Sequence, residues 1–581
     1  MVAEAPPVRP GPKEYWSKVL REYSGGPVAK FLQGGTMGPL RIIDPHLKPV
    51  GIPPPSNLRE AKISPWWSAY KAAAKVEFDG HIKAKTWELV ERSKVPKGKN
   101  ILRGKWVFDD KRDESGRIIK FKARFVAMGF TQKYGVDYQE TFAGVMVGKS
   151  FRIMLVILNE DPTHELEHWD AFTQATLEED IYMFQPELFE DKPDKQVCKL
   201  RKSLYGLKQS AKNWGDLLRD MLKSSGFTPL FSDPCVHLSK VGEGWCVVST
   251  HVDDIFILFN VSGKGLRDRL FKEVSSRVEV DNLGPVSWAL KTNILRDRVN
   301  GVIKISQEGY INQLLQKYSI STTSQVPILP VNFSMDPNGT VGEVVDETLK
   351  KKYQGQIGSL WWLTGISRPD IYYAVHQCSK IQNKPNVVLE NCLVKILEYL
   401  SYTKHIGVVY KRNPQAPLLS GYVDAAFASE DQTLSRTGYF YLFKGNLVSW
   451  NSENPTRIMT SSTEAECRGL VQISKENLWH RQFQEELKLY PLNGPTIVYE
   501  DNQSSITMSN DPGVPHKRSK HFGIEFGYFK QSVQLKEIQV EYISTEDQPA
   551  DMLTKSLQAA KFEKFRDIVM GGEKLQHHFT E

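Results

Sequence analysis

Two runs of β-prone apolar residues flank a pair of adjacent aspartates, and this stretch constrains the fold more than any other. The runs 247–252 and 255–259 read V-V-S-T-H-V and I-F-I-L-F, which predicts a hairpin with Asp253 and Asp254 as its turn. Two carboxylates in an apolar hairpin repel each other and lose hydration, at a cost of several kcal/mol unless a proton or a cation neutralises them. Oxygen ligands of this kind favour Mg²⁺. The alternative is a solvated Asp-Asp turn without a ligand.

Composition limits the class of protein. The chain has 581 residues, of which 40% are hydrophobic and 11% aromatic, so we expect several globular domains, about four by length. A net charge of +7 is a weak indication of a polyanionic partner. None of the six cysteines forms C-x-x-C, which argues against a zinc knuckle and favours a reducing, intracellular setting. We expect no signal peptide and no membrane span, because no apolar run approaches about 18 residues.

Breaks in composition divide the chain into five expected segments. Proline and glycine are frequent at the start and again near 326–339 and 413–417, which is typical of linkers. Helical and strand patterns alternate before the first of these two breaks, and a helical block lies between them. The expected segments are a flexible leader at 1–56, a mixed region at 57–325, helices at 326–415, a compact domain at 416–558 and a C-terminal tail at 559–581.

A series of motifs surrounds the hairpin in a fixed order. They are K-W-V-F-D at 105–109, F-K-A-R-F-V-A-M-G-F-T-Q at 121–132, Y-Q-E-T-F-A at 138–143, L-E-E-D-I-Y-M-F-Q-P-E at 177–187, S-L-Y-G-L-K-Q at 203–209, I-G-S-L-W-W-L at 357–363 and S-R-P-D-I at 367–371. H-V-D-D itself resembles the Y-V-D-D box of reverse transcriptases. Together these motifs resemble the polymerase of copia-type LTR retrotransposon polyproteins, over a region from about Pro55 to Leu557.

The resemblance implies an α+β right-hand polymerase, with fingers and palm in 57–325 and a short thumb or connection in 326–415. It implies that Asp170 joins Asp253 and Asp254 in holding two Mg²⁺ ions, or Mn²⁺, for attack of a primer 3′-hydroxyl on a deoxynucleotide triphosphate. A glycine at 206 would let the backbone approach a base closely. The residues implied to contact nucleotide and template are Lys122, Arg124, Phe172, Tyr205, Gly206, Lys208 and Gln209.

Three residues that the family usually has after the palm acid are missing here. The family pattern is D-x-x-x-A-F, whereas Ala171 and Phe172 directly follow Asp170. Because three extended residues span about 10 Å, we do not expect Asp170 and Phe172 both to take their usual places. His251 also replaces the usual tyrosine. An alternative to an active polymerase is therefore a decayed relic that binds nucleic acid without polymerising, with or without ribonuclease activity.

A second set of acids follows strand and helix patterns in 418–558. Strands are predicted to end near Asp424 and at Asp501. The predicted order of elements is three strands, a helix, a strand, a helix, a strand and a helix, which is typical of a mixed-sheet α/β domain. Glu464 and Glu466 lie about 200° apart on the first predicted helix. Glu466 shares the apolar stripe of that helix and should face the sheet, whereas Glu464 should pair on the outside with Arg468 at i+4.

These segments resemble the RNase H domain of the same elements, whose metals activate water to cut RNA in an RNA–DNA hybrid. The resemblance implies Asp424, Glu466, Asp501 and Asp551 as ligands of two Mg²⁺ ions. Glu500 and Asp547 are expected to be bystanders. A basic stretch is expected to contact hybrid phosphates, with a solvated helix start as the alternative. Its residues are His516, Lys517, Arg518 and Lys520.

The resemblance also implies partners and a location. The partners would be an RNA template, a DNA primer, an RNA–DNA hybrid and deoxynucleotide triphosphates, with no membrane. Capsid and integrase parts are expected elsewhere in the element, which ends its cycle in DNA integration. The expected location is intracellular and cytoplasmic, with virus-like particles as one site.

Overall fold

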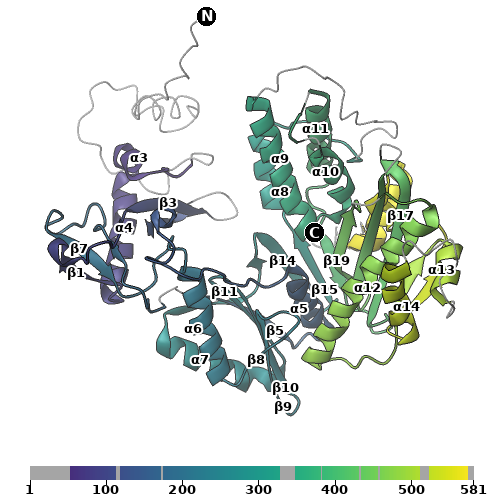
Figure 1. Cartoon of the computed structure of the whole chain (residues 1–581), viewed down its shortest axis with the longest axis horizontal. Coiled ribbons are helices and arrows are strands. Elements are labelled where there is room, and N and C mark those ends of the chain that lie inside the picture. Colours follow the sequence, from purple (N-terminus) through teal and green to yellow (C-terminus); the bar gives the residue numbers. More distant parts are fainter. Residues whose placement is uncertain are drawn as a thin grey trace, which may run out of the picture. The chain divides into compact units, whose positions relative to one another are not determined.

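The computed structural model describes residues 53–112, 118–171, 175–327, 347–380, 382–385, 387–430, 434–455, 458–510 and 523–572. The chain forms two compact units, whose elements are labelled in Figure 1. Unit 1 comprises Met1–Gly144, Ala171–Ser224 and Glu273–Val280. Unit 2 comprises Val145–Asp170, Ser225–Lys272 and Asp281–Glu581. Most of the predicted leader lies outside the described residues. No described helix combines the length and the apolar character needed to cross a membrane.

Unit 1 is built around two small sheets and a long helix. The β3–β4 hairpin alternates, so that Trp106 and Phe108 on β3 and Phe125 on β4 are buried. Tyr70 of α4 packs edge-on against Phe108 and donates a hydrogen bond to Asp110 Oδ1 at 3.0 Å. The elements are α3 (Leu58–Ile63), α4 (Trp67–Lys83), β3 (Gly104–Arg112), β4 (Ile118–Ala127), α6 (Ser210–Ser224) and the sheet β1-β7-β6-β2 with β1 (Trp87–Glu91), β7 (Gln196–Leu200), β6 (Tyr182–Met183) and β2 (Ile101–Leu102).

Unit 2 begins with a six-stranded sheet that carries the Asp-Asp hairpin. Its centre is apolar: all residues of β11 after Asp254 are buried, as expected for a strand covered on both faces. Phe256 packs against Phe151 of α5 (Gly148–Glu160), with ring centroids 4.9 Å apart. The order is β12 (Val280–Pro285), β5 (Glu165–Ala171), β11 (Asp254–Phe259), β10 (Gly244–His251), β9 (Val236–Val241) and β8 (Thr228–Pro229).

A helical block and a four-stranded sheet follow. The S-R-P-D segment lies here, and its Arg368 and Asp370 form a fully buried ion pair at 2.7 Å. Tyr399 of α11 and Thr403, directly after that helix, complete the hydrogen bonds of this pair. The motif is therefore structural, because it joins the helices of the block. The elements are α8 (Glu308–Lys317), α9 (Glu347–Ile366), α10 (Tyr372–Ser379), α11 (Val387–Tyr402) and the sheet β13 (Trp288–Ala289), β14 (Thr292–Asp297), β15 (Val302–Ser306) and β16 (Val408–Lys411).

The C-terminal part is a mixed five-stranded sheet with helices, as predicted. β17, β18 and β19 are antiparallel, whereas β20 runs parallel to β17 and β21 parallel to β20. The side chain of Ser461 accepts a hydrogen bond from the backbone N–H of Glu464 and caps the first helix. The order is β19 (Asn446–Glu453), β18 (Leu434–Phe443), β17 (Leu419–Glu430), β20 (Thr496–Glu500) and β21 (Ile538–Tyr542), and the helices are α12 (Ser462–Leu487), α13 (Gln503–Asn510), α14 (Gly523–Gln534), α15 (Asp551–Thr554) and α16 (Ala559–Met570).

One apolar core runs through unit 2, from the Asp-Asp sheet to the C-terminal sheet. Lys149 of α5 and Glu476 of α12 form an ion pair at 3.0 Å within this packing, and both side chains are largely buried. α16 also packs inward, with Phe562 and Phe565 buried. The compact units therefore follow packing rather than the composition breaks near 326–339 and 413–417, and the predicted segment boundaries stay predictions. The α+β class followed by a mixed-sheet α/β domain is confirmed.

Candidate active sites

The Asp-Asp hairpin turns one residue earlier than predicted. β10 and β11 pair from Cys246↔Phe259 to His251↔Asp254, so the turn residues are Val252 and Asp253, and Asp254 is the first residue of β11. Val252 has φ +55°, a left-handed conformation that is unfavourable for a β-branched residue. Such strain persists only where the surrounding structure enforces it, and it is frequent at functional sites.

Asp170 lies on the strand next to the hairpin. It is directly opposite Asp254 in the antiparallel β5–β11 pair, so the two side chains share one face of the sheet. His168, two residues earlier, lies on the same face, and its Nε2 is 2.7 Å from Asp254 Oδ1. Asp170 therefore lies beside the hairpin, although three residues that the family usually has after it are missing. Phe172 lies outside the described residues.

The nucleotide-binding residues predicted in unit 1 gather at β4 and the loop after β7. The Arg124 guanidinium lies over the Tyr205 ring, 5.4 Å from its centroid, and Lys122 is on the same strand. Lys208 Nζ donates to the Tyr138 hydroxyl at 3.0 Å. An Arg–aromatic pair of this kind leaves guanidinium donors for an anion.

Gly206 and Gln209 have structural roles that the sequence did not reveal. Gly206 has φ +89°, and a Cβ there would lie 2.2 Å from the Ala127 carbonyl oxygen, so the loop packs tightly on β4. The glycine is needed for this contact, and not only for the predicted approach to a base. Gln209 is buried and donates to the Asp137 carbonyl oxygen at 2.9 Å. The amide oxygen of Gln209 also accepts a hydrogen bond from the Gln132 side chain at 3.0 Å. Gln209 therefore holds together the loops that contain Gln132 and Asp137.

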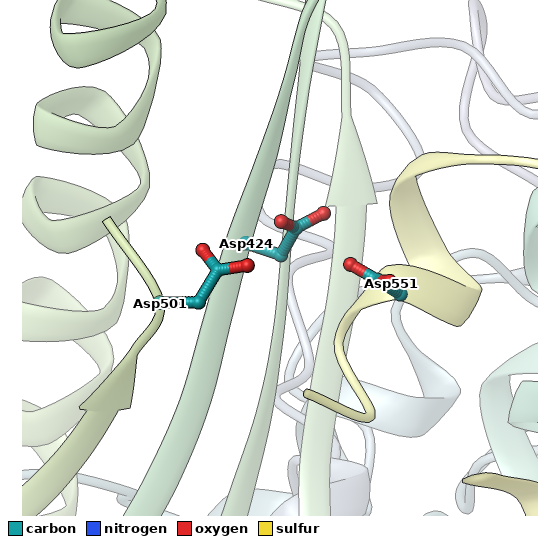
Figure 2. Close-up of side chains that lie close together, drawn as sticks. All are labelled: Asp424, Asp501 and Asp551. Atoms are coloured by element: carbon teal, nitrogen blue, oxygen red, sulfur yellow. The ribbon is translucent and has the colours of Figure 1, made fainter. Parts of the chain in front are cut away.

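The C-terminal sheet gathers the second set of acids. Oxygens of Asp424, Asp501 and Asp551 lie within 4.8 Å of one another, with Asp424 between the other two in Figure 2. Oxygens of Glu466, Glu500 and Asp501 form a second such group. The four predicted acids thus converge, and Asp501 belongs to both groups. Across the described residues these are the two groups found, and the palm acids Asp170, Asp253 and Asp254 form none.

Strand register explains the convergence. Tyr422 of β17 is level with Tyr499 of the parallel strand β20, so Asp424 lies beside the end of β20, where Asp501 follows. Asp424 lies inside β17, which continues to Glu430, rather than near the strand end as predicted. Asp551 begins α15, which approaches β18 closely because residue 438 is glycine: a Cβ there would lie 2.6 Å from Leu553 Cβ.

Among the described residues, lysines form ion pairs on one side of the cluster. Lys555 Nζ is 2.7 Å from Asp551 Oδ1 and 3.6 Å from Asp424 Oδ1, and Lys561 Nζ is 3.3 Å from Asp551 Oδ2. The Thr554 hydroxyl donates to Asp424. Sequence reasoning missed these neighbours, although T-K follows Asp551 at the i+3 and i+4 positions of the helix.

Burial dominates the electrostatics of the acids. It raises the pKa of Asp424 to about 6, with Lys555 opposing and Asp551 reinforcing the shift. Burial also raises the pKa of Glu466 and of Glu500 well above the usual range, and neighbouring carboxylates add to this. One oxygen of each of these two glutamates, Oε2, is buried and has no hydrogen-bond partner. Carboxylate oxygens left in this way suit a hard divalent cation.

These shifts predict a pH-dependent effect of metal on stability. Because the folded-state pKa of Asp424 is raised, the acid's favourable contribution is present below its ordinary pKa of about 4 and is lost as pH rises through about 6. A divalent cation should restore it at the higher pH. We expect Mg²⁺ to raise the melting temperature at pH 8 by about 2 °C or more beyond its effect at pH 5, measured by differential scanning fluorimetry. Equal shifts at both pH values, or the same difference in Asp424→Asn, would contradict this.

Three acids that were not predicted as ligands have different surroundings. Asp547 is exposed and pairs with Lys564 at 2.7 Å, outside the cluster as predicted. Glu464 was predicted to pair outside with Arg468, which is wrong. Glu464 is 5% exposed and accepts from the Thr460 backbone N–H at 2.8 Å, while Arg468 pairs with Glu525. Glu500, predicted to be a bystander, lies in the cluster. The basic residues His516, Lys517, Arg518 and Lys520 lie outside the described residues.

Comparison with known proteins gives the class first. Residues 84–331 match the family described as reverse transcriptase (RNA-dependent DNA polymerase). The chain is 34% identical over 525 residues to the retrovirus-related Pol polyprotein from transposon TNT 1-94 of Nicotiana tabacum, covering 89% of this chain and 39% of the relative. It is 33% identical over 521 residues to the Pol polyprotein from transposon RE1 of Arabidopsis thaliana, covering 88% of this chain and 34% of the relative.

A solved structure of the foamy viral protease-reverse transcriptase in complex with dsDNA is similar at 14% identity and a TM-score of 0.43, over 93% of this chain and 95% of that chain. The family match covers the palm strands with Asp170, Asp253 and Asp254, and the acid cluster of the mixed sheet lies outside the matched residues. Residues 84–331 thus carry a reverse transcriptase domain, and the chain is homologous to Pol polyproteins of copia-type plant transposons, which confirms the predicted resemblance. It spans well under half the length of these relatives.

Proposed function

We propose that the chain is an RNA-directed DNA polymerase that also cleaves the RNA of RNA–DNA hybrids. The observation that carries this proposal is the convergence of five buried or half-buried carboxylates from β17, α12, β20 and α15, in a chain whose residues 84–331 match reverse transcriptases. The convergence of these acids costs free energy through repulsion and lost hydration, and clusters of this kind are typical of functional sites.

Two divalent cations at each site, Mg²⁺ or Mn²⁺, would supply an activated oxygen nucleophile and charge stabilisation for the leaving oxygen. In the nuclease site Asp424, Glu466, Asp501 and Asp551 would hold them. Lys555 then keeps the Asp424–Asp551 side neutral and fixed, so that these carboxylates are positioned before substrate arrives. His516, Lys517, Arg518 and Lys520 would bind phosphates of the hybrid.

In the polymerase site Asp170, Asp253 and Asp254 would hold the cations, and His168 holds the Asp254 carboxylate on the face shared with Asp170. Lys122 and Arg124 would bind the triphosphate of the nucleotide. Tyr205, Lys208 and Phe172 would contact the base and the template. The macromolecular partners would be an RNA template, a DNA primer and their hybrid. We place the activity in the cytoplasm, including virus-like particles, with capsid and integrase supplied by other parts of the element.

A second candidate is a chain whose polymerase is inactive and whose nuclease is active. One contrast favours it: the palm acids form no group within 4.8 Å among the described residues, whereas the C-terminal acids form two. The three residues missing after Asp170 point the same way.

Two assays on the unaltered protein test the proposal and separate the candidates. With Mg²⁺ we expect both extension of a DNA primer on an RNA template and cleavage of the RNA in a preformed hybrid. Chelation of the metal by EDTA should stop both reactions, because carboxylates without cations cannot activate the nucleophile. Cleavage without extension would establish the second candidate, and neither activity with Mg²⁺ or Mn²⁺ would overturn both.

A further inference from the structure

Glu500 is held in the acid cluster by its strand. β20 alternates, so that Thr496, Val498 and Glu500 are buried on one side while the intervening residues are half-buried. β20 pairs with β21 up to Glu500↔Tyr542, and the backbone N–H of Ile543 donates to the Glu500 carbonyl oxygen at 3.0 Å. These contacts with β21 and the residue after it hold the backbone in place at Glu500. Its side chain cannot reach solvent by a local movement of a loop.

The carboxylate of Glu500 is only half satisfied. Oε1 accepts the backbone N–H of Asn502 at 3.0 Å, whereas Oε2 is buried with no hydrogen-bond partner. The side chain is 0% exposed, and Oε2 of Glu466 is in the same state. Unsatisfied buried carboxylate oxygens are costly, and two of them in one group indicate a ligand that supplies positive charge.

Among the described residues, the lysines of the cluster form their ion pairs on its other side. Lys555 and Lys561 pair with Asp551, and Lys555 also with Asp424. In the part of the chain that the structure describes, neither Glu466 nor Glu500 has an ion-pair partner. The two acid groups therefore differ among the described residues: Asp424 and Asp551 are ion-paired with a lysine ammonium, and Glu466 and Glu500 are not.

We propose that Glu500 is a fifth carboxylate ligand of the nuclease site, which binds a hard divalent cation together with Glu466 and Asp501. The inference rests on the proposed function and deepens it. It assigns to Glu500 a direct role that the family resemblance does not give, because the resemblance implies ligands only at Asp424, Glu466, Asp501 and Asp551. Glu500 thereby makes this side of the site one charge more negative than the resemblance implies, which should favour tighter cation binding.

The test compares divalent-cation binding by the full chain with that of Glu500→Gln, which keeps the shape and removes the charge. Bound Mn²⁺ is counted by electron paramagnetic resonance during titration. We expect one class of Mn²⁺ sites to weaken about tenfold or more in Glu500→Gln, since even outer-sphere partners of a metal have effects of that size. Glu500→Asp, which keeps the charge on a shorter side chain, should recover part of the affinity.

The matched control is Glu541→Gln. Glu541 is level with Tyr499 on the neighbouring strand, so it lies on the opposite face of the sheet from Glu500. The Mn²⁺ affinity of Glu541→Gln should equal that of the unaltered protein. In the absence of divalent cations, Glu500→Gln should melt at a higher temperature than the unaltered protein, because the amide avoids the cost of burying an acid among other carboxylates, and Mn²⁺ should stabilise it less.

Unchanged Mn²⁺ affinity in Glu500→Gln overturns the inference. If Asp501→Asn then still loses both hybrid cleavage and Mn²⁺ binding, the proposed nuclease function stands and Glu500 is a buried structural acid. If the unaltered protein neither cleaves hybrid nor binds Mn²⁺, the nuclease proposal and the inference fail together. A lower melting temperature of Glu500→Gln without metal would also count against the inference, since it would mean that the charge is compensated within the protein.

Discussion

Asp501→Asn is expected to reduce cleavage of RNA in an RNA–DNA hybrid by about 10³-fold or more. Asp501 is the one acid that belongs to both groups, so its loss removes a ligand from each. A 10³-fold loss corresponds to about 4 kcal/mol of transition-state stabilisation, which is within the several kcal/mol that a metal supplies. The asparagine keeps size and hydrogen bonding, including contact with the Thr545 hydroxyl at 2.8 Å. The measurement is the single-turnover rate on a hybrid with labelled RNA.

Asp547→Asn is the matched control for this substitution. Asp547 lies in the loop between β21 and α15 but is exposed and pairs with Lys564, so the same loss of charge should leave the cleavage rate unchanged. Primer extension should be unaffected in both variants, because the nuclease acids lie on a different sheet from the palm acids. A cleavage rate in Asp501→Asn close to that of the unaltered protein would show that the acid cluster is not the nuclease site.

The acid cluster shows how far local patterns can go. Strand and helix patterns predicted the strand that carries Asp424, the helix that carries Glu466 and the strand that precedes Asp501, although Asp424 lies inside β17 and not near its end. Asp551 came from the family resemblance. The same alternation could have revealed Glu500, because it shares the buried side of β20 with Val498. It was missed because adjacent residues in a strand normally face opposite ways. Asp501 lies just past the strand, where that rule no longer applies.

Other errors came from tertiary partners that spacing cannot predict. Glu464 and Arg468 have the i,i+4 spacing of an ion pair, which contributes only about 0.2–0.5 kcal/mol. The Thr460 backbone offers Glu464 hydrogen bonds at the helix start, and Glu525 of α14 attracts Arg468. Weak local pairs yield to such contacts. The hairpin turn was displaced by one residue for a related reason, because register depends on strand pairing along the whole of β10 and β11.

The extent of the shared core was also beyond sequence reasoning. Proline-rich breaks mark where the chain changes direction, but they do not show which faces pack afterwards. α5 precedes the Asp-Asp hairpin in sequence, yet its Lys149 pairs with Glu476 in α12, and its Arg152 donates to the Val448 carbonyl oxygen at 2.6 Å. Contacts between residues separated by some three hundred positions leave no local pattern. Unit 2 thus joins the palm strands to the C-terminal sheet.

Asp253→Asn is expected to abolish primer extension on an RNA template, by about 10³-fold or more, and to leave hybrid cleavage intact. The reason is again the loss of one metal-binding charge, worth several kcal/mol in the transition state. Asp253 occupies the strained turn between β10 and β11, next to Asp254 and one strand from Asp170. Asp170→Asn should have an effect of similar size, because Asp170 lies opposite Asp254 despite the missing residues. Extension is measured with a labelled primer under single-nucleotide conditions.

Asp268→Asn provides the control in the same unit. Asp268 lies on α7 (Lys264–Arg277), is exposed and contacts Arg267 at 2.9 Å, so primer extension should be unchanged. If Asp253→Asn lowers extension but Asp170→Asn does not, the third acid is elsewhere, and the register of β5 against β11 does not describe the catalytic arrangement. If the unaltered protein binds template and primer but extends nothing, the palm retains its fold without its chemistry. If hybrid cleavage persists in that case and disappears in Asp501→Asn, the remaining activity belongs to the C-terminal sheet alone.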